Sequence, residues 1–327
     1  MYFYIENLRG WAIMAVVMIH VSASLLYLNP TNSYWMIGHF FDTLSRWSVP
    51  IFIMISGALL LRKEEPLMSF YKKRLYKIIV PFLFWIVFYL FWGSYNSNQP
   101  ISITSSIKTI YTGPVYYHLW YLYMLIGLYL FTPFLRRFVQ HATNKELLLF
   151  IVFSFSLETI TSLAQEYLGL TTMLEVQYFI GYIGFYLLGY YLSFKMQTLI
   201  QRKIFYTLGL LGVAVTFSGT WILSNMNGEL DSWFYRYLSP STIMISIMVF
   251  IFVKHNMNNN ASNILTKYIS KYSFGIYLVH PFFLDILPVS AKWVHPFVGI
   301  PLTWLLCMLM SLFFCILVSR INWIRII

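Results

Sequence analysis

The chain has 327 residues, of which 59% are hydrophobic, 20% are aromatic and only 10% are charged. This composition excludes an ordinary soluble fold and is typical of a chain whose solvent is lipid. The formal net charge of +11 does not indicate a nucleic-acid partner, because most Lys and Arg residues fall in short loops between apolar runs, where they act as a topology signal.

Ten apolar runs are long enough to cross a bilayer, so the sequence predicts an all-α polytopic membrane protein. The predicted spans cover residues 7–28, 35–61, 78–95, 117–138, 147–167, 176–195, 204–224, 238–253, 272–290 and 297–319. The sequence shows no internal repeat and no soluble segment of domain size. We therefore expect residues 1–327 to form a single membrane-embedded domain.

Basic residues are distributed unevenly between the alternate loops. Eighteen fall on one side and three on the other, and because Lys and Arg favour cytoplasmic loops, both termini are predicted to be cytoplasmic, in a multi-pass protein of the plasma membrane. The larger set is Arg9, Arg62, Lys63, Lys72, Lys73, Arg74, Lys77, Arg136, Arg137, Lys145, Lys195, Arg202, Lys203, Lys254, Lys267, Lys271, Arg320 and Arg325, and the smaller set is Lys108, Arg236 and Lys292.

The first span carries a charge at one end and an imidazole in its middle. Arg9 and His20 are eleven residues apart, so on an α-helix they project from one face, separated by about 16 Å along the axis. An ionisable residue at the depth of His20 indicates a functional site. The alternative interpretation, a secretory signal, is disfavoured because its removal would break the parity of the loops and because an imidazole is out of place in a signal's apolar core.

The second span carries two polar groups near its outer end and a small-residue pair near its inner end. Asp42 and Arg46 are spaced i, i+4 and can form an ion pair on one helix face. Ser56 and Gly57 allow either close helix contact or the approach of a ligand.

The loop that follows this span is strongly basic. Arg74 and Lys77 are placed to hold phosphates of a cytoplasmic ligand, although lipid headgroup anchoring explains a basic loop equally well.

Three further stretches carry candidate residues. Trp120 and Tyr121 belong to an aromatic cluster at the outer interface, which is either an interfacial belt or a platform for sugar rings. Glu158 lies within the fifth span and requires a proton or a basic partner. In the ninth span His280 follows Tyr277 and precedes a proline that frees a backbone carbonyl, and its estimated depth is close to that of His20.

These motifs together resemble the acyltransferase 3 family of bacterial membrane O-acyltransferases that modify surface polysaccharides, in a short form without an attached extracytoplasmic domain. The matching features are Arg9 and His20, Phe52 to Gly57, Arg74 with Pro81, Trp120 with Tyr121, and Ser273 to Pro281. Lys77 stands where the family motif commonly has a second arginine. The resemblance implies ten membrane helices, cytoplasmic acetyl-CoA as the acyl-donor substrate, no bound cofactor or metal, and a sugar hydroxyl as acceptor.

We therefore expect acetyl transfer to a hydroxyl of a cell-surface or lipid-linked carbohydrate. His20 is the expected general base with Arg9 beside it, because a hydroxyl needs a base to become a good nucleophile. The expected donor-binding residues are Arg74, Lys77, Ser56, Tyr277 and His280, and the expected acceptor-binding residues are Asp42, Arg46, Trp120, Tyr121 and Glu158.

The alternative function is a transporter or flippase for a lipid-linked glycan, because buried polar residues also mark translocation pathways. Broken helices at corresponding positions of two repeated halves would favour transport. For the enzyme, we expect the donor to enter from the cytoplasm and the acceptor from the outer side. Membrane lipids are the other expected partners, and the oligomeric state is open.

Overall fold

The computed structural model describes residues 3–170, 176–196, 199–257, 264–287 and 294–320. The secondary structure of these residues is helical, with no strand among them, which confirms the all-α prediction. Lys292, Arg325 and the end of the predicted ninth span at 288–290 lie outside the described residues. The α-helices are α1 (Phe3–Ser22), α2 (Ser33–Thr43), α3 (Ser48–Leu60), α4 (Leu67–Ser97), α5 (Ile103–Thr112), α6 (Trp120–His141), α7 (Asn144–Leu168), α8 (Val176–Phe194), α9 (Leu199–Asn227), α10 (Pro240–Asn256), α11 (Ile264–Ile286) and α12 (Pro296–Ser319).

Eight described segments are long and apolar enough to cross a membrane. They correspond to eight of the ten predicted spans. The other two predicted spans coincide with α8, whose apolar described part Phe179–Phe194 is shorter, and with α11. The chain is therefore a polytopic membrane protein.

The predicted second span is divided into α2 and α3 by a turn at residues 44–47. Pro50 explains the interruption, because its ring would collide with the carbonyl of Arg46 and it has no N–H to donate. Within the turn the Trp47 indole N–H donates to the Leu44 carbonyl at 2.7 Å. The segment between α4 and α6 contains the short helix α5, which begins after the N-cap Ser102.

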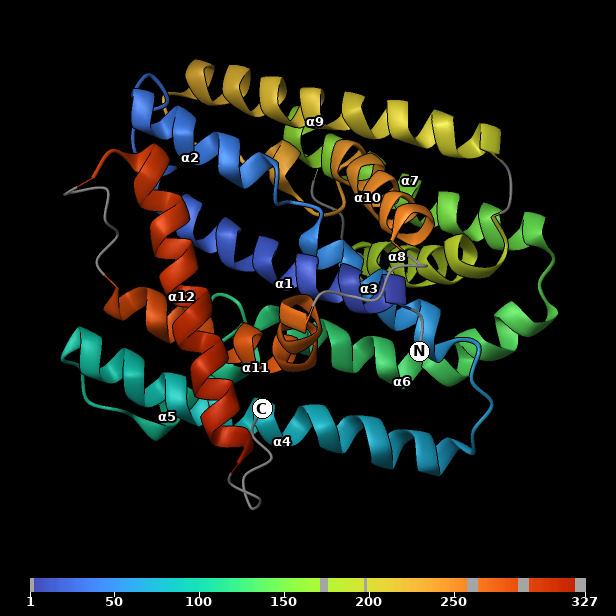
Figure 1. Ribbon diagram of the computed structural model, residues 1–327, viewed down its shortest axis with the longest axis horizontal. Helices are drawn as coiled ribbons and strands as arrows, with labels where there is room; N and C mark the ends of the chain where they lie inside the picture. The colour runs from blue at the N-terminus through green and yellow to red at the C-terminus, as the bar shows by residue number, and fades with distance from the viewer. Residues whose placement is uncertain (1–2, 171–175, 197–198, 258–263, 288–293, 321–327) are drawn as a thin grey trace.

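Helix α1 runs through the middle of the bundle, with α9 along one edge and α4 along the opposite edge (Figure 1). In the segment that contains α1, 61% of the residues in its apolar 18-residue stretch are buried inside the protein, against 22% in the corresponding stretch of α7. A helix that is apolar and covered by protein on most sides can hold polar side chains away from lipid. The Arg9 and His20 helix therefore occupies the interior position that a site requires.

Helices α3 and α8 pack in close contact through two glycines. A Cβ atom on Gly57 would lie 1.8 Å from the Tyr186 carbonyl oxygen, and one on Gly189 would lie 2.0 Å from the Met54 carbonyl oxygen. No side chain fits at either position, so the small residue at Gly57 is required for helix contact.

Candidate active site

A cavity of about 450 Å³ lies between α1, α3, α4, α6 and α11. Three basic side chains line it: Arg9, Lys77 and Lys271. Both lysines are exposed, whereas Arg9 is half-buried. The positive charge therefore extends from the protein surface into the bundle, as a cavity for an anionic ligand requires.

Hydroxyl groups cover the rest of the polar wall. Tyr121, Tyr129 and Tyr277 contribute phenols from α6 and α11, and Ser56 contributes its hydroxyl from α3. Among the described residues, no carboxylate forms a salt bridge with Arg9. A half-buried guanidinium that forms no salt bridge among the described residues is available to bind a ligand anion.

The wall that α1 gives to this cavity ends one helical turn before His20. Val16 lines the cavity, and His20 follows it by one helical turn, about 6 Å further along α1. The His20 ring stacks on the His280 ring with centroids 5.2 Å apart, and it contacts the Tyr117 ring at 4.9 Å. Its side chain is half-buried, so part of the imidazole remains accessible.

The tautomer of His280 follows from its neighbours. Its Nδ1 atom lies 3.0 Å from the Ile276 carbonyl oxygen and 2.9 Å from the Tyr277 carbonyl oxygen. Carbonyl oxygens only accept, so Nδ1 carries the proton and Nε2 holds the lone pair. The Tyr277 carbonyl is available because Pro281 has no N–H to donate to it. The buried Nε2 atom has no hydrogen-bond partner among the described residues.

His118 completes a group of three histidines. Its ring packs edge-on against His280 at 5.6 Å, and neither of its buried ring nitrogens makes a hydrogen bond to a described residue. The Tyr277 hydroxyl donates to the His118 carbonyl. Because Tyr277 also lines the basic cavity, the histidine group and the cavity share a wall.

The predicted donor residues are partly brought together. Lys77, Ser56 and Tyr277 line the basic cavity with Arg9. Arg74 does not line it, and its Nε atom is buried without a hydrogen-bond partner among the described residues. His280 lies beside His20 instead of on the cavity wall.

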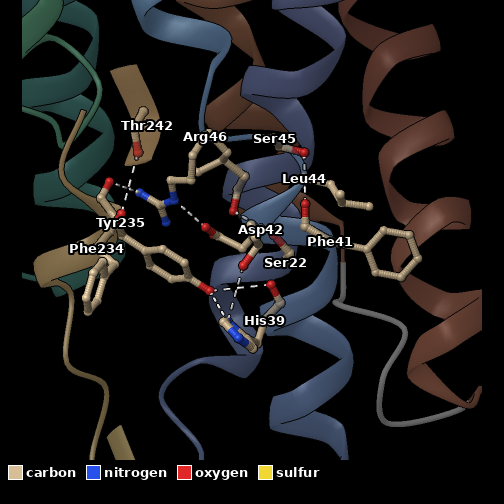
Figure 2. Close-up of polar contacts among 12 residues, drawn as sticks. Ser22, His39, Phe41, Asp42, Leu44, Ser45, Arg46, Phe234, Tyr235 and Thr242 are labelled. Atoms are coloured by element: carbon tan, nitrogen blue, oxygen red, sulfur yellow. Dashed lines mark hydrogen bonds and ion pairs between the residues drawn. The ribbon is translucent and has the colours of Figure 1, made fainter. Parts of the chain in front are cut away.

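Asp42 and Arg46 form the predicted i, i+4 ion pair. The Arg46 guanidinium also lies over the Tyr235 ring at 4.1 Å and donates to the Tyr235 carbonyl at 3.4 Å, as Figure 2 shows. The Tyr235 hydroxyl contacts the His39 ring, whose Nε2 atom is 2.9 Å from the Phe217 carbonyl oxygen. Asp42 is fully buried, so this network joins α2 to α9 internally and does not present Asp42 at an open surface.

The other predicted acceptor residues are dispersed. Trp120 stacks on Tyr237 with centroids 5.7 Å apart. Glu158 shares a small cavity with Arg236, whose guanidinium donates to Ser162 and Glu166.

Tyr121 was grouped with the outer residues because it follows Trp120, but the structure places it on the wall of the basic cavity. Consecutive helical residues point about 100° apart, so adjacent side chains need not share a site.

Several residues at the site had no predicted role. Ser270 lines the cavity, and Lys271, Ser273 and Phe274 precede Tyr277 on the same helix. The spacing of Ser270, Ser273 or Phe274, and Tyr277 follows i, i+3 or i+4, i+7, so they lie on one face. That periodicity was visible in the sequence. The approach of Tyr117 to His20 was not, because the two residues belong to separate segments.

The fold and the site define a class of protein: a polytopic membrane enzyme with a basic cavity that leads towards an intramembrane histidine. A family model described as an acyltransferase domain, that of acyltransferase 3, matches residues 2–320, and the chain belongs to this family. It is a membrane O-acyltransferase that transfers an acyl group to a hydroxyl acceptor. Searches of curated proteins and of solved structures gave no significant match.

Proposed function

We propose that the protein transfers an acetyl group from cytoplasmic acetyl-CoA to a hydroxyl of a cell-surface or lipid-linked carbohydrate at the plasma membrane. The observation that carries this proposal is the position of Arg9 and His20 on α1. Arg9 lines the basic cavity, and His20 lies on the same helix one turn beyond Val16, which also lines it. A donor with an anionic end and a reactive end matches this arrangement, because the anionic end can bind Arg9 while the reactive end lies near His20.

The donor is held by charge at one end. The phosphates of CoA are polyanionic, and Arg9, Lys77 and Lys271 supply positive charge along the cavity. Arg74, which has a buried guanidinium nitrogen without a partner among the described residues, adds positive charge on the same helix as Lys77. The apolar part of the wall, which includes Val16 and Phe52, suits the neutral arm that carries the thioester.

His20 acts as the general base. As the acceptor oxygen attacks the thioester carbonyl carbon, its proton passes to the neutral His20 imidazole and a C–O bond forms. Collapse of the tetrahedral intermediate breaks the C–S bond, and the proton then moves from His20 to the departing thiolate. His280 stacks on His20 and supports the orientation of its ring.

The acceptor reaches His20 from the end of the bundle opposite the basic cavity mouth. Trp120 is half-buried there and its stacking on Tyr237 keeps an aromatic surface near the outer interface. Asp42 and Arg46, which are occupied with each other, maintain the shape of the outer half. Glu158 and Arg236 line a second polar cavity that is too small, at about 10 Å³, to admit a sugar.

The test uses purified, folded protein with radiolabelled acetyl-CoA and a carbohydrate acceptor, in detergent without vesicles. Loss of the general base should lower the transfer rate of His20→Ala by about 10² to 10⁴-fold while leaving donor binding intact. The matched control is His141→Ala, because His141 is exposed at the end of α6. Transfer by His20→Ala near the wild-type rate would overturn the assignment of the base, and absence of transfer by the wild type with every acceptor and acyl donor would overturn the reaction.

A further inference from the structure

Three consecutive side chains in the loop before α6 contact three different residues. The Tyr116 hydroxyl donates to Asp285 of α11, the Tyr117 ring lies against His20, and the His118 ring packs against His280. Asp285 and Tyr117 are both exposed. This loop therefore connects the surface of the predicted outer end directly with the proposed base.

The Asp285 carboxylate is held by two hydrogen bonds, and both are accepted by one of its two oxygens. The Trp92 indole N–H donates to its Oδ2 atom at 2.7 Å, and the Tyr116 hydroxyl donates to the same oxygen. Burial raises the pKa of Tyr116, as does its contact with Asp285, so the phenol stays protonated and keeps donating. No described residue donates to Oδ1, and an ionised carboxylate can accept about four hydrogen bonds. The exposed Asp285 carboxylate can therefore accept further hydrogen bonds from a ligand.

Aromatic rings stand around this carboxylate in fixed orientations. Tyr116 stacks on Tyr89 at 4.3 Å with an interplanar angle of 17°, and Trp92 stacks on Tyr95 at 5.7 Å and 22°. Tyr95 is 74% exposed and Tyr117 is 47% exposed. Aromatic faces beside a hydrogen-bond acceptor match a sugar ring, which has an apolar C–H face and hydroxyl donors at its edge.

We propose that Trp92, Tyr95, Tyr116, Tyr117 and Asp285, here called the outer platform, bind a neutral sugar ring of the acceptor and deliver its hydroxyl to His20. The proposal rests on the acyl-transfer function above and specifies its acceptor site. A single negative charge accepts hydrogen bonds from hydroxyls and repels acidic sugars, because the juxtaposition of like charges is unfavourable. The acceptor class is therefore a neutral hexose or N-acetylhexosamine unit and not a uronic acid.

An interfacial aromatic belt is the competing explanation of the same rings. A belt anchors helices at the headgroup level, so its residues affect stability and membrane insertion but not acceptor affinity. The two explanations differ in the apparent KM for acceptor, which only a binding platform changes.

The experiment measures initial rates of acetyl transfer to methyl glycosides of glucose, galactose, mannose, N-acetylglucosamine and glucuronic acid. The wild type should use at least one neutral glycoside and not the glucuronide. Tyr117→Ala and Asp285→Asn should each raise the KM for the neutral acceptor about tenfold, with the KM for acetyl-CoA unchanged. Tyr117→Phe retains the ring and should keep a near wild-type KM. The matched control is Tyr111→Ala, because Tyr111 is 91% exposed on α5 and packs on no described ring.

The outcomes separate this proposal from the proposed function. Unchanged acceptor KM in Tyr117→Ala and Asp285→Asn, with transfer still dependent on His20, would overturn the outer platform alone. Efficient use of the glucuronide by the wild type would overturn the assigned acceptor class. If Tyr117→Ala fails to fold, Asp285→Asn and Tyr117→Phe decide the question, because a belt predicts no change of KM in either and the platform predicts a change only in the former.

Discussion

Substitution of Gly57 by alanine should destabilise the helix pair on which the basic cavity depends. The added Cβ would lie 1.8 Å from the Tyr186 carbonyl oxygen, whereas ordinary van der Waals contact begins at 3.4 Å. Helix α3 must therefore move away from α8 by about 1.6 Å. Backbone carbonyls cannot rotate aside as a flexible side chain can. Overpacking of this kind costs about 3 kcal/mol, which exceeds the roughly 1 kcal/mol that alanine gains over glycine in a helix.

The assay is thermal unfolding of the purified protein in one detergent, followed by the KM for acetyl-CoA. We expect the Tm of Gly57→Ala to fall by roughly 5 °C or more. The KM should rise as well, because α3 carries Phe52 and Ser56 on the cavity wall.

Gly93→Ala is the control, since a Cβ at Gly93 meets nothing within 4 Å, and it should leave Tm unchanged or slightly raised. An unchanged Tm in Gly57→Ala would refute the close α3 and α8 contact.

Three further predictions concern charge. Arg9→Met should raise the KM for acetyl-CoA about tenfold or more and weaken its dependence on salt, measured between low and high ionic strength, because a guanidinium without a described salt-bridge partner is lost from the cavity. Asp42→Ala should lower stability by about 2 to 4 kcal/mol in denaturant or thermal unfolding, since it leaves the half-buried Arg46 without its ion-pair partner, and the double variant with Arg46→Met should recover part of the loss. Burial alone would raise the pKa of Glu65, but the hydrogen bond and charge of Arg136, at 3.0 Å, lower it below its usual 4.5. The stabilisation from this carboxylate is therefore present above pH 4.5 and is lost as the pH falls through the lowered value, so Glu65→Gln should have a lower Tm than the wild type at pH 7, and the difference in Tm should shrink as the pH is lowered below 4.5.

The central features could be predicted because they depend on spacing within one helix. The eleven-residue interval in α1 predicts one face for Arg9 and His20; in the structure Arg9 lines the cavity, and His20 lies one turn beyond Val16, which also lines it. The ion pair of Asp42 and Arg46 follows from i, i+4 spacing for the same reason. Pro50 indicates a break between α2 and α3, but because apolar residues continue on both sides of it, hydropathy predicts one continuous span.

The parts that could not be predicted depend on contacts between distant segments. Tyr116 and Asp285 are 169 residues apart, and no local pattern indicates that they meet. An aromatic cluster in a membrane protein has the same composition whether it anchors helices or binds sugars, so the cluster around Tyr117 could not be assigned from composition. The neighbouring carboxylate and the histidine contact support the proposed outer platform, and both require the three-dimensional arrangement.

The hydrogen bond from Tyr277 to the His118 carbonyl joins the basic cavity to the loop that precedes α6. Tyr277 lines that cavity, and His118 follows Tyr117, which belongs to the proposed outer platform. A donor that shifts Tyr277 must therefore shift the loop or break this bond, which makes the two binding equilibria interdependent. Linkage requires that the factor by which the donor changes acceptor affinity equal the factor by which the acceptor changes donor affinity. Under the proposed function, binding of the donor in the cavity changes the acceptor affinity of the outer platform before any group is transferred.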